Sequence, residues 1–225
     1  MSKCDQCIIR QFNALKALGK DDLVRISGCK TSRFVQKGEV LFREGESING
    51  IFCVKDGVCK LSKLSANGKD QIVKLVVKGD LIGQRSLVSD EKSNLTAVAV
   101  NEMEVCFIPK SEILHDLSKN ASFSLDMLQD MAKELRIADN VIVDMAQKSV
   151  KQRLADVLIY LHETFDKDKD GYLSVILSRE DYASLVGTAT ESAIRILSQF
   201  KKEGLIATTG KHVMILDLEG LRRIE

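Results

Sequence analysis

The residues best suited to chemistry lie near the end of the sequence, along one segment predicted to be a helix from Thr190 to Glu203. Glu191 and Arg195 are four residues apart in this segment, so both side chains lie on the same face. An arginine can bind guanine O6 and N7 through two hydrogen bonds, and a glutamate can accept one from cytosine N4. The spacing therefore indicates either reading of adjacent base pairs or an ordinary ion pair on a helix surface.

Two short helices and a pair of strands are predicted to position these residues. Ser178 and Asp181 have the spacing of a capping box, which predicts a helix that ends at Gly187, a residue that permits a tight turn. Two short apolar runs, residues 205–207 and 213–216, predict a β-wing. A helix-turn-helix with a wing favours DNA binding, with a protein-binding winged helix as the alternative. The spacing of the second helix predicts a buried face made of Ala193, Ile196, Leu197 and Phe200.

Basic residues near these elements are suited to phosphate contacts, which hold a protein on DNA without reading its sequence. The chain has 33 lysine and arginine residues and 32 acidic ones, a formal net charge of +1. This charge excludes a strongly basic coat, although a small basic face remains compatible with it. The predicted phosphate-binding residues are Arg179, Lys201, Lys202 and Lys211.

Cysteines offer a second kind of chemistry. Cys4 and Cys7 form a C-x2-C motif near the N-terminus, and Cys106 lies just before an Ile-Pro pair. These residues could bind a metal or iron–sulfur cluster, form a regulatory disulfide, or remain simple thiols. Cys53 and Cys59 flank Asp56-Gly57. A two-residue turn there would place their thiols on opposite faces of a hairpin, so we expect them to pack as small apolar side chains.

The region from residue 34 to 109 is predicted to be a compact β domain. Short apolar runs alternate with glycine-containing turns about every six to twelve residues, a pattern typical of a barrel, sandwich or roll. The expected strands are LFREG, GIFCVK, VCKLSKL, QIVKLVV and VAVNEMEVCFI. The preceding segment from Ile8 to Ser27 has roughly helical apolar spacing, with a break near Gly19.

A long helix is predicted after the β domain, because its apolar residues step alternately by three and four positions. This narrow seam has two interpretations. It is either one edge of a buried helix or a surface that pairs with its own copy in a parallel dimer. The predicted seam consists of Leu128, Met131, Leu135, Ala138, Ile142 and Met145.

The stretch LSREDYASLVGTATESAIRILSQFKKEGLI resembles the winged helix-turn-helix of the CRP/FNR family of bacterial transcription regulators. QKGEVLFREGE and VKGDLIG resemble the β-roll of the cyclic-nucleotide-binding type in the same family. The resemblance runs from about residue 8 to the end of the chain. It implies that Glu191 and Arg195 belong to the recognition motif and that Thr190 and Ile194 occupy variable reading positions. It also implies a homodimer, double-stranded DNA with a roughly palindromic site, and RNA polymerase as partners.

The resemblance bears on the signal as well. In members that bind cyclic AMP, a glutamate for the ribose and an Arg-Ser pair for the phosphate follow G-D-x-x-G. An ungapped match places Gln84 at the glutamate position and Asn94 and Leu95 at the Arg-Ser positions, so we do not expect cyclic AMP. The Arg85-Ser86 pair lies ten residues too early and is interpreted as a coincidence. Another ligand could use the same pocket, predicted to consist of Gly83, Gln84, Arg85, Asn94, Leu95 and Thr96.

Oxygen-sensing iron–sulfur members of the family place cysteines much as this chain places Cys4, Cys7 and Cys106. Those members have a further cysteine six positions after the C-x2-C, where this chain has Asn13. A cluster normally takes four ligands, and Cys29 is the candidate for the fourth. The resemblance therefore implies a redox or iron–sulfur sensor as an alternative, while the cofactor itself stays unknown.

The predicted fold class is α+β. An N-terminal helical and cysteine-containing segment (1–28) precedes a β-roll of the double-stranded β-helix or jelly-roll type (29–118). A dimerisation helix (119–148) and a winged helix-turn-helix domain (149–225) follow. The predicted function is a sequence-specific transcription regulator, and the absence of any catalytic motif argues against an enzyme.

Two further predictions concern location and metal binding. The chain has no apolar run of membrane-spanning length and no signal-peptide pattern, so we expect a cytoplasmic protein without a membrane partner. Residues 166–171 imitate the start of a calcium loop, but Leu177 stands where a bidentate glutamate is needed. We interpret this segment as a solvated loop.

Overall fold

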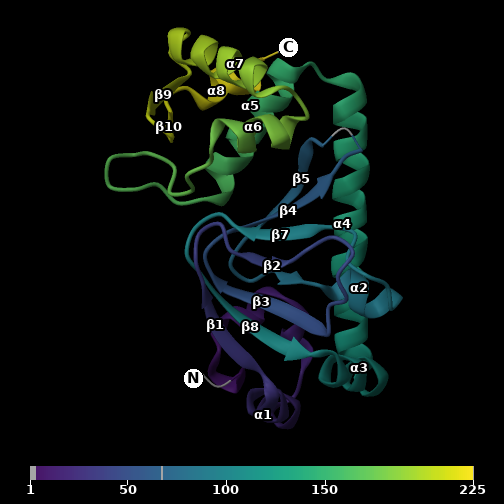
Figure 1. The fold of residues 1–225 in the computed structure, drawn as a ribbon. Coiled ribbons are helices and arrows are strands. Elements are labelled where there is room, and N and C mark those ends of the chain that lie inside the picture. Colours follow the sequence, from purple (N-terminus) through teal and green to yellow (C-terminus); the bar gives the residue numbers. More distant parts are fainter. Residues whose placement is uncertain (1–3, 67, 225) are drawn as a thin grey trace. The chain divides into compact units, whose positions relative to one another are not determined.

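The computed structural model describes residues 4–66 and 68–224, so the first three residues of the predicted N-terminal segment and the last residue of the predicted DNA-binding domain lie outside it. Contacts divide the chain into two compact units. The first contains residues 1–63 and 74–137, and the second contains residues 64–73 and 138–225. Figure 1 labels most helices and strands of both units.

Two four-stranded antiparallel sheets form the β-roll, which confirms the predicted class of fold. The first has the order β1-β8-β3-β6, formed by Thr31–Val35, Met103–Pro109, Gly50–Asp56 and Leu81–Ile82. The second has the order β2-β7-β4-β5, formed by Val40–Phe42, Thr96–Ala99, Cys59–Leu64 and Asp70–Val76.

Strand β3 is buried on both of its faces. Phe52 and Val54 contribute to one apolar core, which includes side chains from both sheets. Ile51 and Cys53 point to the opposite face and join a second core. This alternation follows from the two-residue period of a strand, so both cores depend on the register of β3.

The second core is completed by the N-terminal segment and by helices that follow the roll. A short 3-10 helix, η1 (Cys4–Gln6), precedes the segment predicted to be helical from Ile8. That segment begins as two more 3-10 helices, η2 (Ile8–Phe12) and η3 (Ala14–Ala17). A regular helix, α1 (Lys20–Cys29), follows the break at Gly19. Arg25 of α1 pairs with Glu112 and Asp116 of α3 (Lys110–Lys119), a helix that the sequence patterns did not predict.

A single helix, α4 (Ala121–Gln147), follows and carries the predicted seam. Its first turns contribute Phe123 and Met127 to the second core. A short helix, α2 (Gln84–Ser89), lies between β6 and β7 and was also not predicted.

The second unit contains the predicted helix-turn-helix. Helix α5 (Val150–Thr164) begins with a capping box formed by Ser149 and Gln152. Helices α6 (Arg179–Val186) and α7 (Thr190–Lys202) follow, and strands β9 (Ile206–Thr209) and β10 (His212–Ile215) pair as the wing. A final helix, α8 (Leu218–Arg222), packs on α5.

The predicted hairpin between Cys53 and Cys59 is wrong. Strand β3 pairs with β8 and β6, whereas β4 pairs with β7 in the other sheet. The turn at Asp56-Gly57 therefore crosses between sheets instead of closing a hairpin. Both cysteines are buried, and they lie in different cores.

Gly57 provides a test of this crossing. Its φ is +88°, and a Cβ there would lie 2.4 Å from the carbonyl oxygen of Glu102. Gly38 has a similar φ of +82° with no atom within 4 Å of the Cβ position. We expect Gly38→Ala to cost about 1 kcal/mol through backbone strain alone. Gly57→Ala should cost distinctly more, because the backbone must also shift. Equal losses in denaturant unfolding would contradict this account of the turn.

Candidate DNA-binding interface and sensor sites

The turn between α6 and α7 is built from local sequence signals. Ser178 and Asp181 form the predicted capping box at the start of α6. Gly187 ends α6 with a φ of +64°, a left-handed conformation that glycine adopts without a steric penalty. Helix α7 then begins at Thr190, the residue at which the sequence predicts its start.

Helix α7 has one buried face and one exposed face. The four predicted apolar residues are buried, whereas Glu191, Ile194 and Arg195 are exposed and Thr190 is half-buried. Within the described residues no ion pair joins Glu191 to Arg195. Both charged groups therefore remain available to an external partner.

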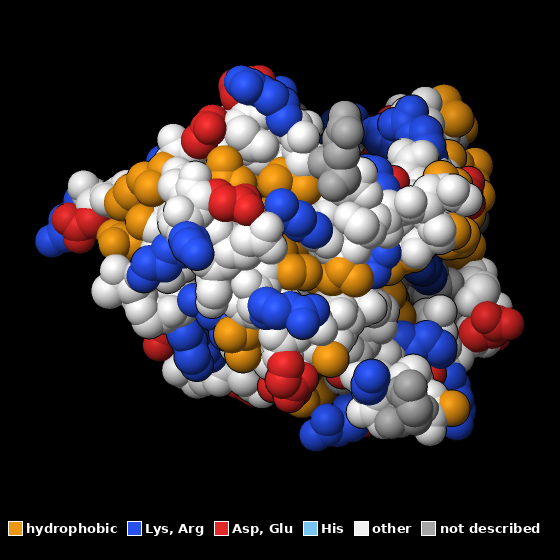
Figure 2. Space-filling view, turned by 90° about the horizontal axis from the view of Figure 1, so that it is seen from above, with side chains coloured by type: hydrophobic (Ala, Val, Ile, Leu, Met, Phe, Trp, Pro, Cys, Tyr) orange, Lys and Arg blue, Asp and Glu red, His pale blue; other side chains and the backbone are white. Residues whose placement is uncertain are grey.

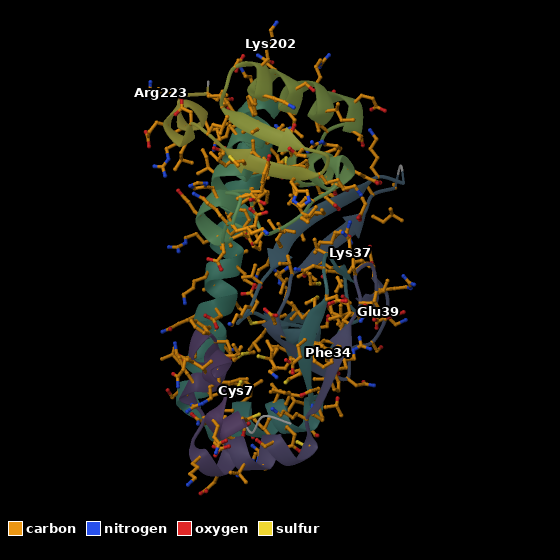
Figure 3. All side chains as sticks on the ribbon, turned by 90° about the vertical axis from the view of Figure 1, so that its left-hand side faces the viewer. Cys7, Phe34, Lys37, Glu39, Lys202 and Arg223 are labelled. Atoms are coloured by element: carbon orange, nitrogen blue, oxygen red, sulfur yellow. The ribbon has the colours of Figure 1, made fainter. Side chains whose placement is uncertain are left out.

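Two of the four predicted phosphate-binding residues also brace the wing. The Arg179 Nη2 donates to the carbonyl oxygen of Gly210 at 3.0 Å, and its buried Nη1 has no hydrogen-bond partner. The Lys201 Nζ donates to the carbonyl oxygen of Thr208 at 3.2 Å. Lys202 and Lys211 are exposed, and Figure 3 shows the Lys202 side chain extending away from the ribbon.

On the one face that Figure 2 shows, the basic side chains of the described residues are not gathered into one large patch. On the face seen in Figure 2, lysine and arginine side chains are spread among apolar, polar and acidic ones. This distribution agrees with the net charge of +1. An interface with DNA would therefore rely on a few placed contacts, with limited help from a broad positive field.

The predicted seam of α4 is exposed in the single chain. Leu128, Leu135 and Ile142 are 62%, 64% and 66% exposed, and Ala138 is exposed as well. Met131 and Met145 are half-buried. These values argue against the interpretation of the seam as the edge of a buried helix.

A small cavity of about 30 Å³ lies where an effector pocket was predicted. Five of the six predicted residues line it, namely Gly83, Gln84, Arg85, Asn94 and Leu95. Thr96 does not line the cavity, and its hydroxyl accepts a hydrogen bond from the backbone N–H of Glu44. Arg85, whose pairing with Ser86 was interpreted as a coincidence, supplies a cation to the lining.

That cation is already paired. Arg85 donates to Oε2 of Glu134 through Nε and Nη2, at 3.3 and 3.1 Å. The Lys74 Nζ lies 2.9 Å from Oε1 of the same carboxylate. Glu134 belongs to α4 and also lines the cavity, so its carboxylate already neutralises Arg85, the one arginine among the described residues of the lining. The sequence gives no signal for this long-range pair.

A second cavity of about 20 Å³ is lined by four cysteines. Cys4, Cys7 and Cys106 were predicted to come together, and Cys53 joins them. Cys29 does not line this cavity, and its thiol bonds to carbonyl oxygens of its own helix. The sequence did not predict that Cys53 would belong to this site. In the structure it lies directly opposite Cys106 in the pairing of β3 with β8.

Asn13 lies beside the same cysteines. Its Nδ2 donates to the Cys53 Sγ at 3.6 Å and to the carbonyl oxygen of Gly79 at 2.8 Å. Burial, together with smaller contributions from the nearby thiols of Cys106 and Cys7, raises the pKa of the Cys53 thiol to about 12, and the hydrogen bond from Asn13 opposes this shift. The thiol of Cys53 is therefore protonated at neutral pH unless a bound cation stabilises the thiolate.

Metal-binding groups and membrane-spanning helices are both absent from the described residues. No group of three or more histidine, cysteine, aspartate or glutamate side chains there is arranged to hold a metal ion. Likewise, no helix in the described ranges is long and apolar enough to span a membrane.

Comparisons with known sequences match both parts of the chain. The profile of the cyclic nucleotide-binding domain matches residues 32–120, and that of the Crp-like helix-turn-helix domain matches residues 152–224. The anaerobic regulatory protein of Haemophilus influenzae is 28% identical over 224 residues, covering 97% of this chain and 86% of that protein. The fumarate and nitrate reduction regulatory protein of Escherichia coli is 26% identical over 225 residues, covering 98% and 89%.

Solved structures share the fold. FixK2 from Bradyrhizobium japonicum superposes with a TM-score of 0.78 at 22% identity, covering 87% of this chain and 97% of that chain. A CRP/FNR-family regulator from Eubacterium rectale gives a TM-score of 0.76 at 20% identity, covering 92% and 94%.

The exposed seam leads to a prediction about self-association. Leu135→Asp would place a charge in the seam, and burying an unpaired charge costs several kcal/mol. We expect self-association to weaken by about 100-fold or more, as measured by analytical ultracentrifugation. Leu114→Asp, which changes an exposed leucine of α3, is the control and should leave the oligomeric state unchanged. An equally strong effect of the two substitutions would count against a role for the seam.

Proposed function

Because this chain belongs to the CRP/FNR family of transcription regulators, we propose that it binds a specific double-stranded DNA sequence as a homodimer. Its β-roll would receive the signal that controls binding. The relatives named above are regulatory proteins, and we assign regulation rather than catalysis to this chain. RNA polymerase as a further partner and the cytoplasm as its location belong to the same proposal.

The exposed face of α7 carries the proposal. Glu191 and Arg195 project from the first turns of this helix, the part that reaches base edges when such a helix enters the major groove. Arg195 would donate to a guanine and Glu191 would accept from a cytosine. Thr190 and Ile194 would contact the neighbouring bases, and Arg179, Lys201, Lys202 and Lys211 would contact phosphates.

Pairing of two α4 helices through their seams would place two copies of α7 around a two-fold axis. Such a dimer binds a roughly palindromic site whose halves lie about one helical turn apart. The exposure of Leu128, Leu135 and Ile142 supports this arrangement, since apolar side chains of this size gain free energy when a second copy covers them.

A direct test is the operator affinity of Arg195→Ala, with the operator selected from a pool of random duplexes. We expect a loss of about 1–3 kcal/mol for the selected sequence and little change for unrelated DNA. Arg43→Ala, an exposed arginine of the β-roll, should change neither affinity. An unchanged ratio of specific to nonspecific affinity would remove Arg195 from the reading positions. Failure to select any sequence, with no salt-dependent DNA binding, would favour the protein-binding winged helix.

The four-cysteine cavity favours a second candidate, in which the signal acts on these thiols. Four thiols are the donor set of iron–sulfur clusters, which supply redox chemistry when bound. Cys4, Cys7, Cys53 and Cys106 would hold the cluster as thiolates, each after loss of its proton. In this structure the four thiols are not arranged to hold a metal ion, and the cavity of about 20 Å³ has room for about one water. The 3-10 segment that carries Cys4 and Cys7 would therefore have to shift outward before a cluster could bind.

This candidate is tested by the iron and acid-labile sulfide content of protein purified without oxygen. We expect the wild-type chain to contain both and Cys53→Ser to lose most of its iron, because a cluster needs four ligands. Cys29→Ser and Cys59→Ser should keep their iron, the latter being a control for substitution of a buried cysteine. A colourless, iron-free wild type would rule out the cluster. Loss in Cys29→Ser with retention in Cys53→Ser would assign the fourth ligand to Cys29.

A further inference from the structure

The segment between α5 and α6, whose residues 166–171 resemble the start of a calcium loop, packs against the wing. Residues 166–170 are exposed. The Leu173 N–H donates to the carbonyl oxygen of Val213 at 2.9 Å, so the segment runs along the outer edge of β10, beside the wing in Figure 1. A two-stranded hairpin is only marginally stable by itself, and this neighbouring backbone therefore limits how far the wing can move.

One aspartate of this segment orients Tyr172. The Asp168 Oδ1 accepts the backbone N–H groups of Asp170 and Tyr172, both at 2.9 Å. The backbone N–H of Asp168 donates in turn to the carbonyl oxygen of Tyr172 at 2.8 Å. An aspartate that accepts backbone N–H groups two residues and more ahead of it fixes a tight turn. Tyr172 is thereby held at a defined position beside the wing.

Tyr172 contacts the last pair of residues in the wing. Thr209 of β9 lies opposite His212 of β10, and the turn of Gly210 and Lys211 joins them. The Tyr172 and Thr209 hydroxyl oxygens lie 2.9 Å apart, within hydrogen-bond distance. The Tyr172 ring also meets the His212 ring edge to face, with the two ring centroids 6.0 Å apart. One tyrosine therefore holds both strands at the point where the turn begins.

Lys211 is the cation of that turn. Its side chain is exposed and forms no ion pair with the described residues. The hydrogen bonds from Arg179 and Lys201 hold the backbone of the same wing at Gly210 and Thr208. Ordering a mobile turn on binding costs conformational entropy, and this cost is smaller when the turn is already fixed in the free protein. A wing held in this way presents the Lys211 ammonium group from a fixed base.

We propose that Tyr172 is the positioning residue of the wing, because its hydroxyl fixes the turn from which Lys211 contacts a DNA phosphate. The inference rests on the proposed function as a DNA-binding regulator. It concerns how tightly DNA of any sequence is held, since phosphate contacts do not read bases. Loss of the Tyr172 hydroxyl should therefore weaken binding to all duplexes, whereas loss of Arg195 should weaken binding to the selected sequence alone.

Salt-dependent binding of the full-length chain tests this proposal, with the operator selected above and with an unrelated duplex. Each phosphate contact contributes about 0.9 to the slope of log affinity against log salt, so Lys211→Met should reduce the slope of a two-winged dimer by about 1.8. Tyr172→Phe keeps the ring and removes only the hydroxyl. It should weaken binding to both duplexes by about three- to tenfold, the net worth of one or two hydrogen bonds. It should also reduce the slope by about 1.

Two further variants act as a replicate and a control. Thr209→Val removes the other hydroxyl of the contact and should reproduce the effect of Tyr172→Phe. Tyr160→Phe, which removes the hydroxyl of an exposed tyrosine of α5, should bind both duplexes as the wild type does. Equal unfolding transitions of the wild type and Tyr172→Phe in denaturant show that the variant is folded.

A double-mutant cycle connects Tyr172 to Lys211. In a Lys211→Met background Tyr172→Phe should have no further effect, because the contact that Tyr172 positions is already lost. An equal loss of affinity with and without Lys211 would reduce Tyr172 to a general structural role and overturn the inference. A loss of affinity at an unchanged salt slope would overturn it as well.

The remaining outcomes separate the inference from its premise. If the wild type selects no duplex and shows no salt-dependent binding, the proposed function fails and the inference fails with it. If the wild type binds its operator and Lys211→Met binds equally well, only the inference fails. The same holds if Lys211→Met weakens binding while Tyr172→Phe does not.

Discussion

Helix α4 carries more apolar surface than one chain buries, and much of the proposed function follows from this constraint. Its first turns give Phe123 and Met127 to the core beneath the β-roll, whereas Leu128, Leu135 and Ile142 remain exposed. A second copy is the partner whose own seam matches this one in length and spacing. The same helix brings Glu134 to the cavity that contains Arg85, so the surfaces proposed for pairing and for sensing share a few turns.

The chain has many charged residues but almost no net positive charge with which to attract DNA. Arg179 and Lys201 donate hydrogen bonds to the wing, whereas Arg195, Lys202 and Lys211 are exposed and have no ion pair among the described residues. Inside the β-roll, Arg85 is neutralised by Glu134. A regulator built this way depends on a few directional contacts in two copies, since weak nonspecific attraction to phosphate adds little affinity.

Local patterns predicted the helix-turn-helix closely. The capping box at Ser178, the left-handed Gly187 and the apolar spacing of α7 act within a few residues, and the structure places these elements where expected. Predictions failed where pairing is remote. The hairpin predicted between Cys53 and Cys59 was wrong because β3 and β4 belong to different sheets. The residues of the turn between them do not determine the register of β3 against β8. The 3-10 helices near Cys4 were also not predicted, since their apolar spacing resembles that of a regular helix.

The sequence by itself determined the two domain types, the readable face of α7 and the seam of α4, because each depends on periodicity or capping within one segment. Only the tertiary structure brought Cys53 and Asn13 to the other cysteines, Glu134 to Arg85, and Ser184 to the edge of β5. These contacts join residues between 40 and 114 positions apart. Their partners are chosen by sheet register and helix packing, which depend on the burial of the whole core and not on any local pattern.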